Sequence, residues 1–375
     1  MMRGILTFYH HAMSNLNVVH ILWTLGRAGA ERMVLDLCRY AKSEGHEPHV
    51  IAAGGEGVMK KDFDEAGIPT TALVATNIFQ RGKLVKEIAK RLQEIKPDVV
   101  HTHLGGDVWG GKAATRLGLH PWVMTAHSHE DDIPFHQRFG RRFAYANADH
   151  VAAVSKSVAT AIERRYGITK DRVSIIPVGL DLERFRRRER GLPSDIPELI
   201  SIGRLVPEKG HETLLKALAN IEHPFILRLV GHGPEYLRLH RLAESLGILP
   251  RVQFHGVVDD VAPLLRKSDI FCFPSRHEGQ GVALYEAAAA EVPIIASDLA
   301  SFRERFDESM MTFVKQDDVD AWTKAIQSMM RDYGMALEKA KRAREEVKLH
   351  YTKEAMGEAY FALYRRLIKT AAKRG

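Results

Sequence analysis

Two carboxylates in the second half of the sequence stand eight residues apart around a glycine-rich turn. Glu278 precedes the turn at residues 279–281, and Glu286 follows about two helical turns later. Glycines let the backbone approach a ligand closely, and carboxylates beside such a turn can hold the hydroxyl groups of a sugar or a ribose. Because alanines occupy residues 287–290, we expect Glu286 to be closely packed and to have a partner. The segment predicts a site for a polyhydroxylated ligand.

Two cations follow an earlier strand-like run. Arg204 comes directly after Gly203, and Lys209 directly before Gly210. A guanidinium binds phosphate oxygens through its planar fork, and an ammonium binds them as a point charge. Two cations beside two glycines favour a pyrophosphate site over the alternative, a solvated loop with a capping glycine.

A third candidate loop lies near the N-terminus. Gly26 and Gly29 follow the first strand-like run and open a helix, whose N-terminus favours an anion. The two glycines also suit a tight turn that binds nothing. They lack the third glycine of the dinucleotide-binding fingerprint, so the loop alone does not identify a ligand.

Four histidines stand near two strand ends. His101 and His103 end one run, and His127 and His129 follow the next, with carboxylates at 130–132. Such a set can hold zinc or manganese, which makes a metal-dependent hydrolase an alternative function. Against it, we expect the histidines of each pair to point to opposite faces if the strand continues, and no third fixed ligand stands out. We therefore predict core or loop histidines and no metal site. The motifs of serine hydrolases (G-x-S-x-G) and of P-loop nucleotidases (G-x-x-x-x-G-K-[ST]) do not occur.

The elements that must position these residues are short apolar runs alternating with helical patterns. Most runs lack polar alternation, which is typical of parallel strands buried on both faces. They predict strands over residues 18–23, 48–54, 98–104, 122–126 and 150–155, and over 198–203, 225–231, 252–256, 269–274 and 293–297. Helical stripes lie within 33–41 and 84–95, and the pattern is helical from Asp320 onward. The prediction is an α/β protein with two Rossmann-like, doubly wound parallel-sheet domains. Ligands of such sheets bind beyond the carboxyl ends of the strands, where all the candidate residues stand.

An arginine-rich segment without apolar periodicity separates the two halves. We expect an N-terminal domain over residues 1–182, a C-terminal domain over 183–350, and a last helix over 351–375 that packs back on the domains. The net charge of +7 is concentrated in residues 184–190 and 365–374, which hold ten of the 54 basic residues and one of the 47 acidic ones. The remaining 44 basic and 46 acidic residues nearly balance, so we predict no nucleic-acid partner.

Several features bear on location. Cys38 and Cys272 are too few for a disulfide framework, no apolar run reaches about 18 residues, and the N-terminus does not resemble a secretory signal. These features predict a cytoplasmic protein. Phe135, Phe139 and Phe143 recur at helical spacing with arginines at 138, 141 and 142 between them. Such a helix can rest on the anionic inner face of a membrane, or can bury its phenylalanines in the core.

Several motifs stand in one order along the chain: Gly29-Ala30-Glu31, Thr125-Ala126-His127-Ser128, Ile202-Gly203-Arg204-Leu205 with Glu208-Lys209-Gly210, Val230-Gly231-His232-Gly233-Pro234, and the E-x7-E element of Glu278 and Glu286. In these motifs the sequence resembles glycosyltransferase family 4, whose enzymes are retaining transferases, from about Val18 to Tyr364. The resemblance implies the GT-B fold, in which two Rossmann-like domains face a central cleft.

The resemblance also implies roles for individual residues. Arg204 and Lys209 would bind the donor diphosphate, and Glu286 the ribose hydroxyls. No metal or other cofactor is implied, because the two cations replace the ion that D-x-D enzymes use. Glu278 would hold the donor sugar together with the backbone of Gly279, Gln280 and Gly281, and His127 would contact that sugar from the opposite domain. Val257 would meet the base, and the loop of Gly26 and Gly29 would also line the donor site. The groups taken as catalytic are His127, Glu278, Arg204 and Lys209.

The sequence departs from the family pattern at four places. Val178 stands where asparagine is usual, Gln280 replaces phenylalanine, Glu291 replaces glycine, and Ala300-Ser301 replaces a glycine pair. The phosphate and ribose positions match. The resemblance therefore implies a retaining transferase that moves a hexose or N-acetylhexosamine from a nucleotide sugar, UDP-linked in preference to GDP-linked. The acceptor would be a glycan or a lipid-linked sugar in cell-surface polysaccharide synthesis. A nucleotide-sugar epimerase, the metal-dependent hydrolase and a non-catalytic nucleotide-sugar binder are the alternatives.

Overall fold

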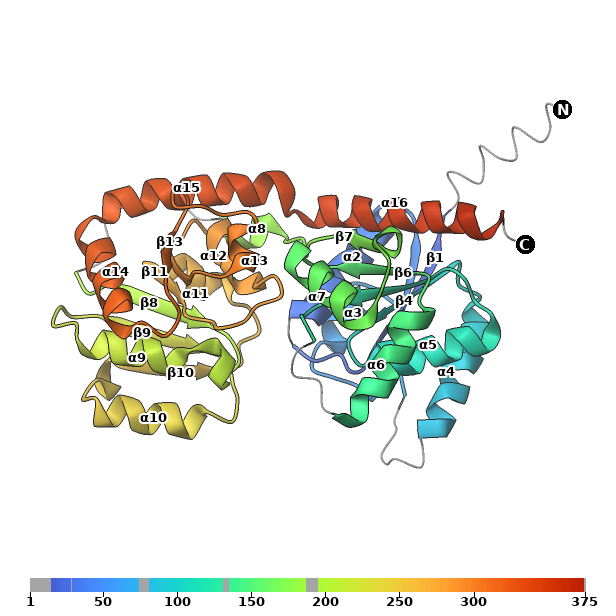
Figure 1. The fold of residues 1–375 in the computed structure, drawn as a ribbon, viewed down its shortest axis with the longest axis horizontal. Coiled ribbons are helices and arrows are strands. Elements are labelled where there is room, and N and C mark those ends of the chain that lie inside the picture. The colour runs from blue at the N-terminus through green and yellow to red at the C-terminus, as the bar shows by residue number, and fades with distance from the viewer. Residues whose placement is uncertain (1–14, 28, 74–80, 131–134, 187–194, 374–375) are drawn as a thin grey trace. The chain divides into compact units, whose positions relative to one another are not determined.

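The computed structural model describes residues 15–27, 29–73, 81–130, 135–186 and 195–373. The chain forms two compact units (Figure 1): residues up to Gly179 together with those from Lys353, and Leu180–Thr352. The chain therefore passes between the units twice. The crossings fall three residues before and two residues after the expected boundaries at 182 and 350, and the last helix belongs to the first unit. Residues 187–190 and 374 of the basic segments, and the N-terminal residues 1–14, lie outside the described part.

The first unit is a seven-stranded parallel sheet with helices between its strands (Figure 1). Its strand order is β3-β2-β1-β4-β5-β6-β7, so the winding direction reverses between β1 and β4. The strands are β1 (Asn17–Leu22), β2 (Glu47–Ala52), β3 (Thr70–Ala72), β4 (Val99–His103), β5 (Trp122–Ala126), β6 (His150–Ala153) and β7 (Val173–Ile175). The helices are α2 (Gly29–Ser43), α3 (Lys60–Glu65), α4 (Arg81–Ile95), α5 (Gly106–Leu117), α6 (Phe135–Asn147), α7 (Lys156–Tyr166) and α16 (Lys353–Ala371).

The second unit repeats this plan with six parallel strands in the order β10-β9-β8-β11-β12-β13. The direction reverses between β8 and β11, as it does between β1 and β4 in the first unit. The strands are β8 (Glu198–Ile202), β9 (Ile226–Val230), β10 (Val252–Gly256), β11 (Ile270–Phe273), β12 (Ile294–Ser297) and β13 (Thr312–Val314). The helices are α8 (Leu182–Phe185), α9 (His211–Ala219), α10 (Tyr236–Ser245), α11 (Ala262–Lys267), α12 (Val282–Ala289), α13 (Ala300–Arg303), α14 (Val319–Arg331) and α15 (Tyr333–His350).

The two doubly wound sheets confirm the predicted fold class, and all ten predicted strands are present. Three further strands, β3, β7 and β13, have three residues each and lie at sheet edges. An edge strand this short leaves no apolar run long enough to predict it. Within β11, Phe271 and Phe273 join one buried cluster while Ile270 and Cys272 join another on the opposite face. The uninterrupted apolar runs arise because both faces of the sheet are covered.

Helix α16 follows α15 and packs against α2 of the first unit (Figure 1). Tyr360, Phe361 and Tyr364 are buried, and the Phe361 ring stacks on His46 with the ring centroids 4.2 Å apart. Within the described ranges, no helix combines the length and apolarity needed to cross a bilayer. Cys38 and Cys272 are buried free thiols.

Candidate functional site

The candidate residues of the second unit follow four neighbouring strands. The loops after β10, β9, β8 and β11 carry Val257, Gly231, Arg204 and Glu278, and these strands are adjacent and parallel. Their carboxyl ends therefore meet at one edge of the sheet, on both sides of the point where the winding reverses. Open parallel sheets bind ligands at this place.

At the centre of this edge Lys209 and Glu278 form an ion pair. Lys209 Nζ contacts Glu278 Oε1, to which the Ser275 hydroxyl also donates a hydrogen bond of 2.8 Å. The two side chains are only 19% and 9% exposed, so water screens the pair weakly. The structure thus brings together the cation expected on a diphosphate and the carboxylate expected on a sugar, although 69 residues separate them.

Glycines allow the loops at this edge to approach one another. Gly210 has φ +65°, and a Cβ there would lie 2.1 Å from the carbonyl oxygen of Pro274. Gly231 has φ +138°, and its Cβ would lie 1.9 Å from the carbonyl oxygen of Gly203. Either added carbon would collide with backbone. The glycines therefore keep the cation loops close to the loops after β9 and β11.

The remaining donor candidates take different positions around the pair. Arg204 is exposed, and Val257 is 61% exposed beyond the end of β10. Gly281 is the N-cap of α12 with φ +78°, and Gln280 beside it is buried. Glu286 is partly buried within α12 and has interaction partners, as its packed neighbours predict.

In the first unit, Gly26 and Gly29 lie between β1 and the first turn of α2, as predicted. The loop after β2 comes close to them. A Cβ on Gly57 would lie 2.1 Å from the carbonyl oxygen of Leu25, so only glycine fits there.

His127 follows β5 directly and is partly buried. Its Nε2 has no hydrogen-bond partner within the described part of the chain. Burial, with a smaller contribution from the nearby Arg141 cation, lowers the pKa of His127 to about 3. The ring is therefore neutral at physiological pH, and the hydrogen-bonding capacity of its buried Nε2 is not used by the described residues.

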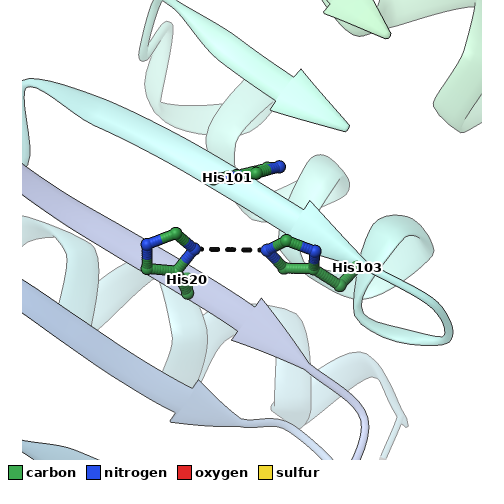
Figure 2. Close-up of side chains that lie close together, drawn as sticks. All are labelled: His20, His101 and His103. Carbon is green, nitrogen blue, oxygen red and sulfur yellow. Dashed lines mark hydrogen bonds between the residues drawn. The ribbon is translucent and has the colours of Figure 1, made fainter. Parts of the chain in front are cut away.

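Beside His127 lies a cluster of buried histidines that the sequence predicted only in part. His20 of β1 pairs in register with His101 of β4, and His20 Nδ1 lies 3.2 Å from His103 Nε2 (Figure 2). The rings of His101 and His103 lie 4.0 Å apart, and that of His103 lies 5.7 Å from His127. We expected His101 and His103 on opposite faces, which is wrong because side chains two residues apart in a strand share a face. His20 stands in the middle of an apolar run, so the sequence did not predict that it would lie beside His101 and His103.

His20, His101 and His103 each offer a nitrogen within 4.8 Å of the others, as a metal site would require. His101, however, uses both ring nitrogens, bonding Thr125 Oγ1 at 2.7 Å and the Tyr364 hydroxyl at 2.6 Å. His129 of the expected ligand set lies 3.1 Å from the Ser157 hydroxyl instead. Asp131 and Asp132 lie outside the described residues. His101 is therefore engaged in hydrogen bonds at both nitrogens, whereas the buried His20 Nε2 and His103 Nδ1 have no hydrogen-bond partner among the described residues.

This cluster makes the stability of the protein sensitive to acid. Burial lowers the pKa of His20 to about 3 and the pKa values of His101 and His103 well below 6.5. The unfolded chain takes up protons below pH 6.5 while the folded chain does not, so stability is lost as the pH falls from about 6.5 towards 3. At pH 4.5 each such histidine should cost about 3 kcal/mol. Thermal melting between pH 7.5 and 4.5 checks this, and His20→Gln should flatten the decline. An equal decline in that variant would contradict the expectation.

Helix α6 is the element that was interpreted as a possible membrane contact. Phe139 is 77% exposed, and Arg138 and Arg142 are exposed beside it. Phe143 is partly buried, and the side chain of Phe135 lies outside the described residues. Arg141 does not belong to the exposed face, because its side chain is buried against Asp107 and Glu130. The predicted set of three surface arginines is therefore wrong for Arg141.

The whole chain is similar to known proteins. A model described as "Glycosyltransferase Family 4" matches residues 27–184, and one described as "Glycosyl transferases group 1" matches residues 183–350. The lipopolysaccharide core biosynthesis glycosyltransferase LpsE of Rhizobium meliloti is 31% identical over 339 residues, covering 89% of this chain and 95% of LpsE. A D-inositol 3-phosphate glycosyltransferase of Xylanimonas cellulosilytica is 28% identical, covering 85% of this chain and 84% of the relative.

Among solved structures, Anabaena HepE in complex with UDP and glucose aligns with a TM-score of 0.83 at 19% identity, covering 93% of this chain and 99% of that one. Such neighbours, with the two doubly wound sheets, show that the chain has the GT-B fold. The chain belongs to glycosyltransferase family 4, as LpsE and the two family models show.

Proposed function

We propose that this glycosyltransferase moves a hexose or N-acetylhexosamine from a nucleotide sugar to a glycan or lipid-linked acceptor in cell-surface polysaccharide synthesis, with retention at the anomeric carbon. The observation that carries the proposal is the Lys209–Glu278 pair at the edge where the sheet of the second unit reverses direction. A sugar diphosphate needs a cation for its phosphates beside a carboxylate for its hydroxyls, and this pair supplies the two groups side by side.

The relatives support the donor and acceptor classes. LpsE is named for lipopolysaccharide core biosynthesis, and the HepE structure contains UDP and glucose. A UDP-linked hexose is therefore the first donor to test, with GDP-linked sugars next. A glycan is the first acceptor, although another relative is named for a phosphorylated inositol.

In the proposed reaction, the bond between the anomeric carbon and the diphosphate breaks as the acceptor oxygen attacks from the same face. Negative charge grows on the leaving phosphate, where Arg204 and Lys209 stabilise it without a metal ion. The acceptor hydroxyl passes its proton to that phosphate, so product and nucleotide diphosphate account for all atoms. Glu278 holds sugar hydroxyls, Glu286 holds the ribose, and the neutral ring of His127 offers Nε2 to a further hydroxyl.

A panel of nucleotide sugars tests the proposal. Thermal shifts identify the donor that binds, release of nucleotide diphosphate on adding glycan acceptors reports transfer, and NMR of the product gives the anomeric configuration. A β-linked product from an α-linked donor would contradict retention. Conversion of the donor without acceptor would indicate an epimerase, and binding without turnover a nucleotide-sugar binder. Activity lost in a chelator and restored by zinc or manganese would contradict the metal-free reaction.

The exposed face of α6 leads to a prediction about membranes. We expect the protein to float with vesicles containing anionic phosphatidylglycerol at low salt, because Phe139 stands exposed beside Arg138 and Arg142. Phe139→Ala should weaken this binding about 10- to 100-fold, since about 1.5–3 kcal/mol of apolar burial is lost. Met335→Ala, which removes an exposed apolar side chain from the second unit, is the matched control. Failure of the unaltered protein to float with these vesicles would end the proposal of membrane contact.

A further inference from the structure

A buried arginine joins the two loops that follow β4 and β5. Arg141 of α6 donates from Nη1 to the carbonyl oxygen of Leu104 at 2.9 Å and contacts the Asp107 carboxylate, and its Nη2 lies 3.0 Å from Glu130 Oε1. The Arg141 side chain is 14% exposed, and the Asp107 and Glu130 side chains are 0% and 2% exposed. One cation thus binds both loops at positions that water hardly reaches.

Both loops have unfavourable backbone conformations at the residues that Arg141 holds. Leu104 has φ +52° and Glu130 has φ +63°, a region that side chains other than glycine rarely adopt. Such residues persist only where their surroundings impose the conformation, and they gather at functional sites. Glu130 is held further, because Tyr166 donates its hydroxyl to Oε2 at 3.0 Å and Arg165 donates to the carbonyl oxygen at 2.7 Å.

The charges of this group are costly to bury. Burial opposes the charged form of Arg141, but Asp107 and Glu130 outweigh it and raise its pKa. Burial raises the pKa of Asp107 to about 7, against the lowering effect of Arg141. Well-packed apolar residues often stabilise a core as well as buried ion pairs do, so stability alone does not explain the arrangement. Its fixed geometry is what apolar packing would not reproduce.

The two loops carry the histidines at the carboxyl edge of the sheet. His103 directly precedes Leu104, and His127 stands three residues before Glu130. We propose that Arg141 is a positioning residue for His127: by holding Leu104, Asp107 and Glu130 together, it sets the place at which the unpartnered Nε2 of His127 meets a substrate hydroxyl. This inference rests on the proposed function, which gives His127 its hydroxyl.

Two variants separate positioning from folding. Arg141→Lys keeps the charge but lacks the planar fork, so it cannot serve a carbonyl and two carboxylates together. The triple variant Arg141→Met, Asp107→Asn, Glu130→Gln removes the fork without leaving a carboxylate unpaired, so it should fold even where a single variant does not. Arg172→Lys is the matched control. Arg172 also donates to backbone carbonyls, those of Tyr145 at 3.2 Å and Ala146 at 3.3 Å, but at the C-terminal end of α6.

The experiment follows the ring of His127 by NMR in the full chain with labelled histidine, its signal identified by loss in His127→Gln. We expect this signal to shift or broaden in Arg141→Lys and in the triple variant. In the control, Arg172→Lys, the signal should stay unchanged. On the donor found by the panel, kcat should fall by up to about tenfold, no further than in His127→Ala, with the donor KM within about twofold.

The proposal is overturned if the His127 signal and kcat stay unchanged in a folded variant at Arg141, or if Arg172→Lys changes them equally. A protein that turns over no nucleotide sugar would instead contradict the proposed function. The NMR result would still decide whether Arg141 positions His127.

Discussion

Replacing Lys209 by methionine is expected to reduce kcat/KM for the nucleotide sugar about 100- to 1,000-fold. Its Nζ is the partly buried cation of the proposed diphosphate site, and the negative charge that it faces increases as the bond to the sugar breaks. Loss of one well-placed electrostatic group in a water-poor site costs about 3–4 kcal/mol of transition-state stabilisation. Steady-state kinetics with calorimetric titration of the nucleotide diphosphate measures the loss in turnover and in binding separately.

The ion pair with Glu278 complicates this result and also supplies its control. Lys209→Met leaves Glu278 with the Ser275 hydroxyl but without the Lys209 cation, which destabilises the loop apart from any effect on phosphate. Lys209→Met combined with Glu278→Gln removes that unpaired charge, so it should recover thermal stability but not activity. Lys216→Met, which removes an exposed pair with Glu212 on α9, should change neither. Wild-type kcat/KM in the single variant would contradict the role of Lys209.

The region around Lys209 and Glu278 could be predicted because the parallel topology determines which loops lie at the same edge of the sheet. Once parallel strands are recognised from apolar runs, the residues after adjacent strands must meet at one edge, however far apart they lie in the chain. Gly203 directly follows one such run, and Glu278 lies in the loop after another. The reasoning needs no side-chain geometry, and it predicted two doubly wound parallel sheets, although not their strand order or the contact between Lys209 and Glu278.

The contacts of His20 and Arg141 were not predicted, because they depend on residues far away in the sequence and not on local residue spacing. His20 lies in the middle of an apolar strand and joins His103 across 83 residues. Arg141 was assigned to a surface because it stands among phenylalanines and arginines at helical spacing. Its position in the helix turns it towards Asp107 and Glu130 instead, and burying an arginine is favourable only when two such carboxylates are in place. Neither partner is implied by the pattern around Arg141.

The second large effect should divide binding from chemistry between two residues of the proposed site. Glu286→Gln weakens a hydrogen bond to the ribose that is the same before and during bond breaking. Donor binding should therefore weaken by about 1–3 kcal/mol, seen as a higher donor KM, with kcat little changed. His127→Ala should do the reverse, because its hydroxyl belongs to the sugar on which positive charge develops. We expect kcat to fall about tenfold while the affinity for the nucleotide diphosphate survives.

The protonation state of His127 also bears on its assigned role in catalysis. With its pKa lowered to about 3 by burial and by Arg141, the ring stays neutral between pH 6 and 8. We therefore expect no titration of His127 in the pH profile of kcat. Any step near pH 6.5 in the unaltered enzyme should persist in His127→Gln. Kinetics of both variants across pH 6–8, with calorimetry of nucleotide binding, gives the answer. If His127→Ala abolished nucleotide binding while Glu286→Gln bound normally, the two roles would be exchanged, and His127 would belong to the nucleotide and not to the sugar.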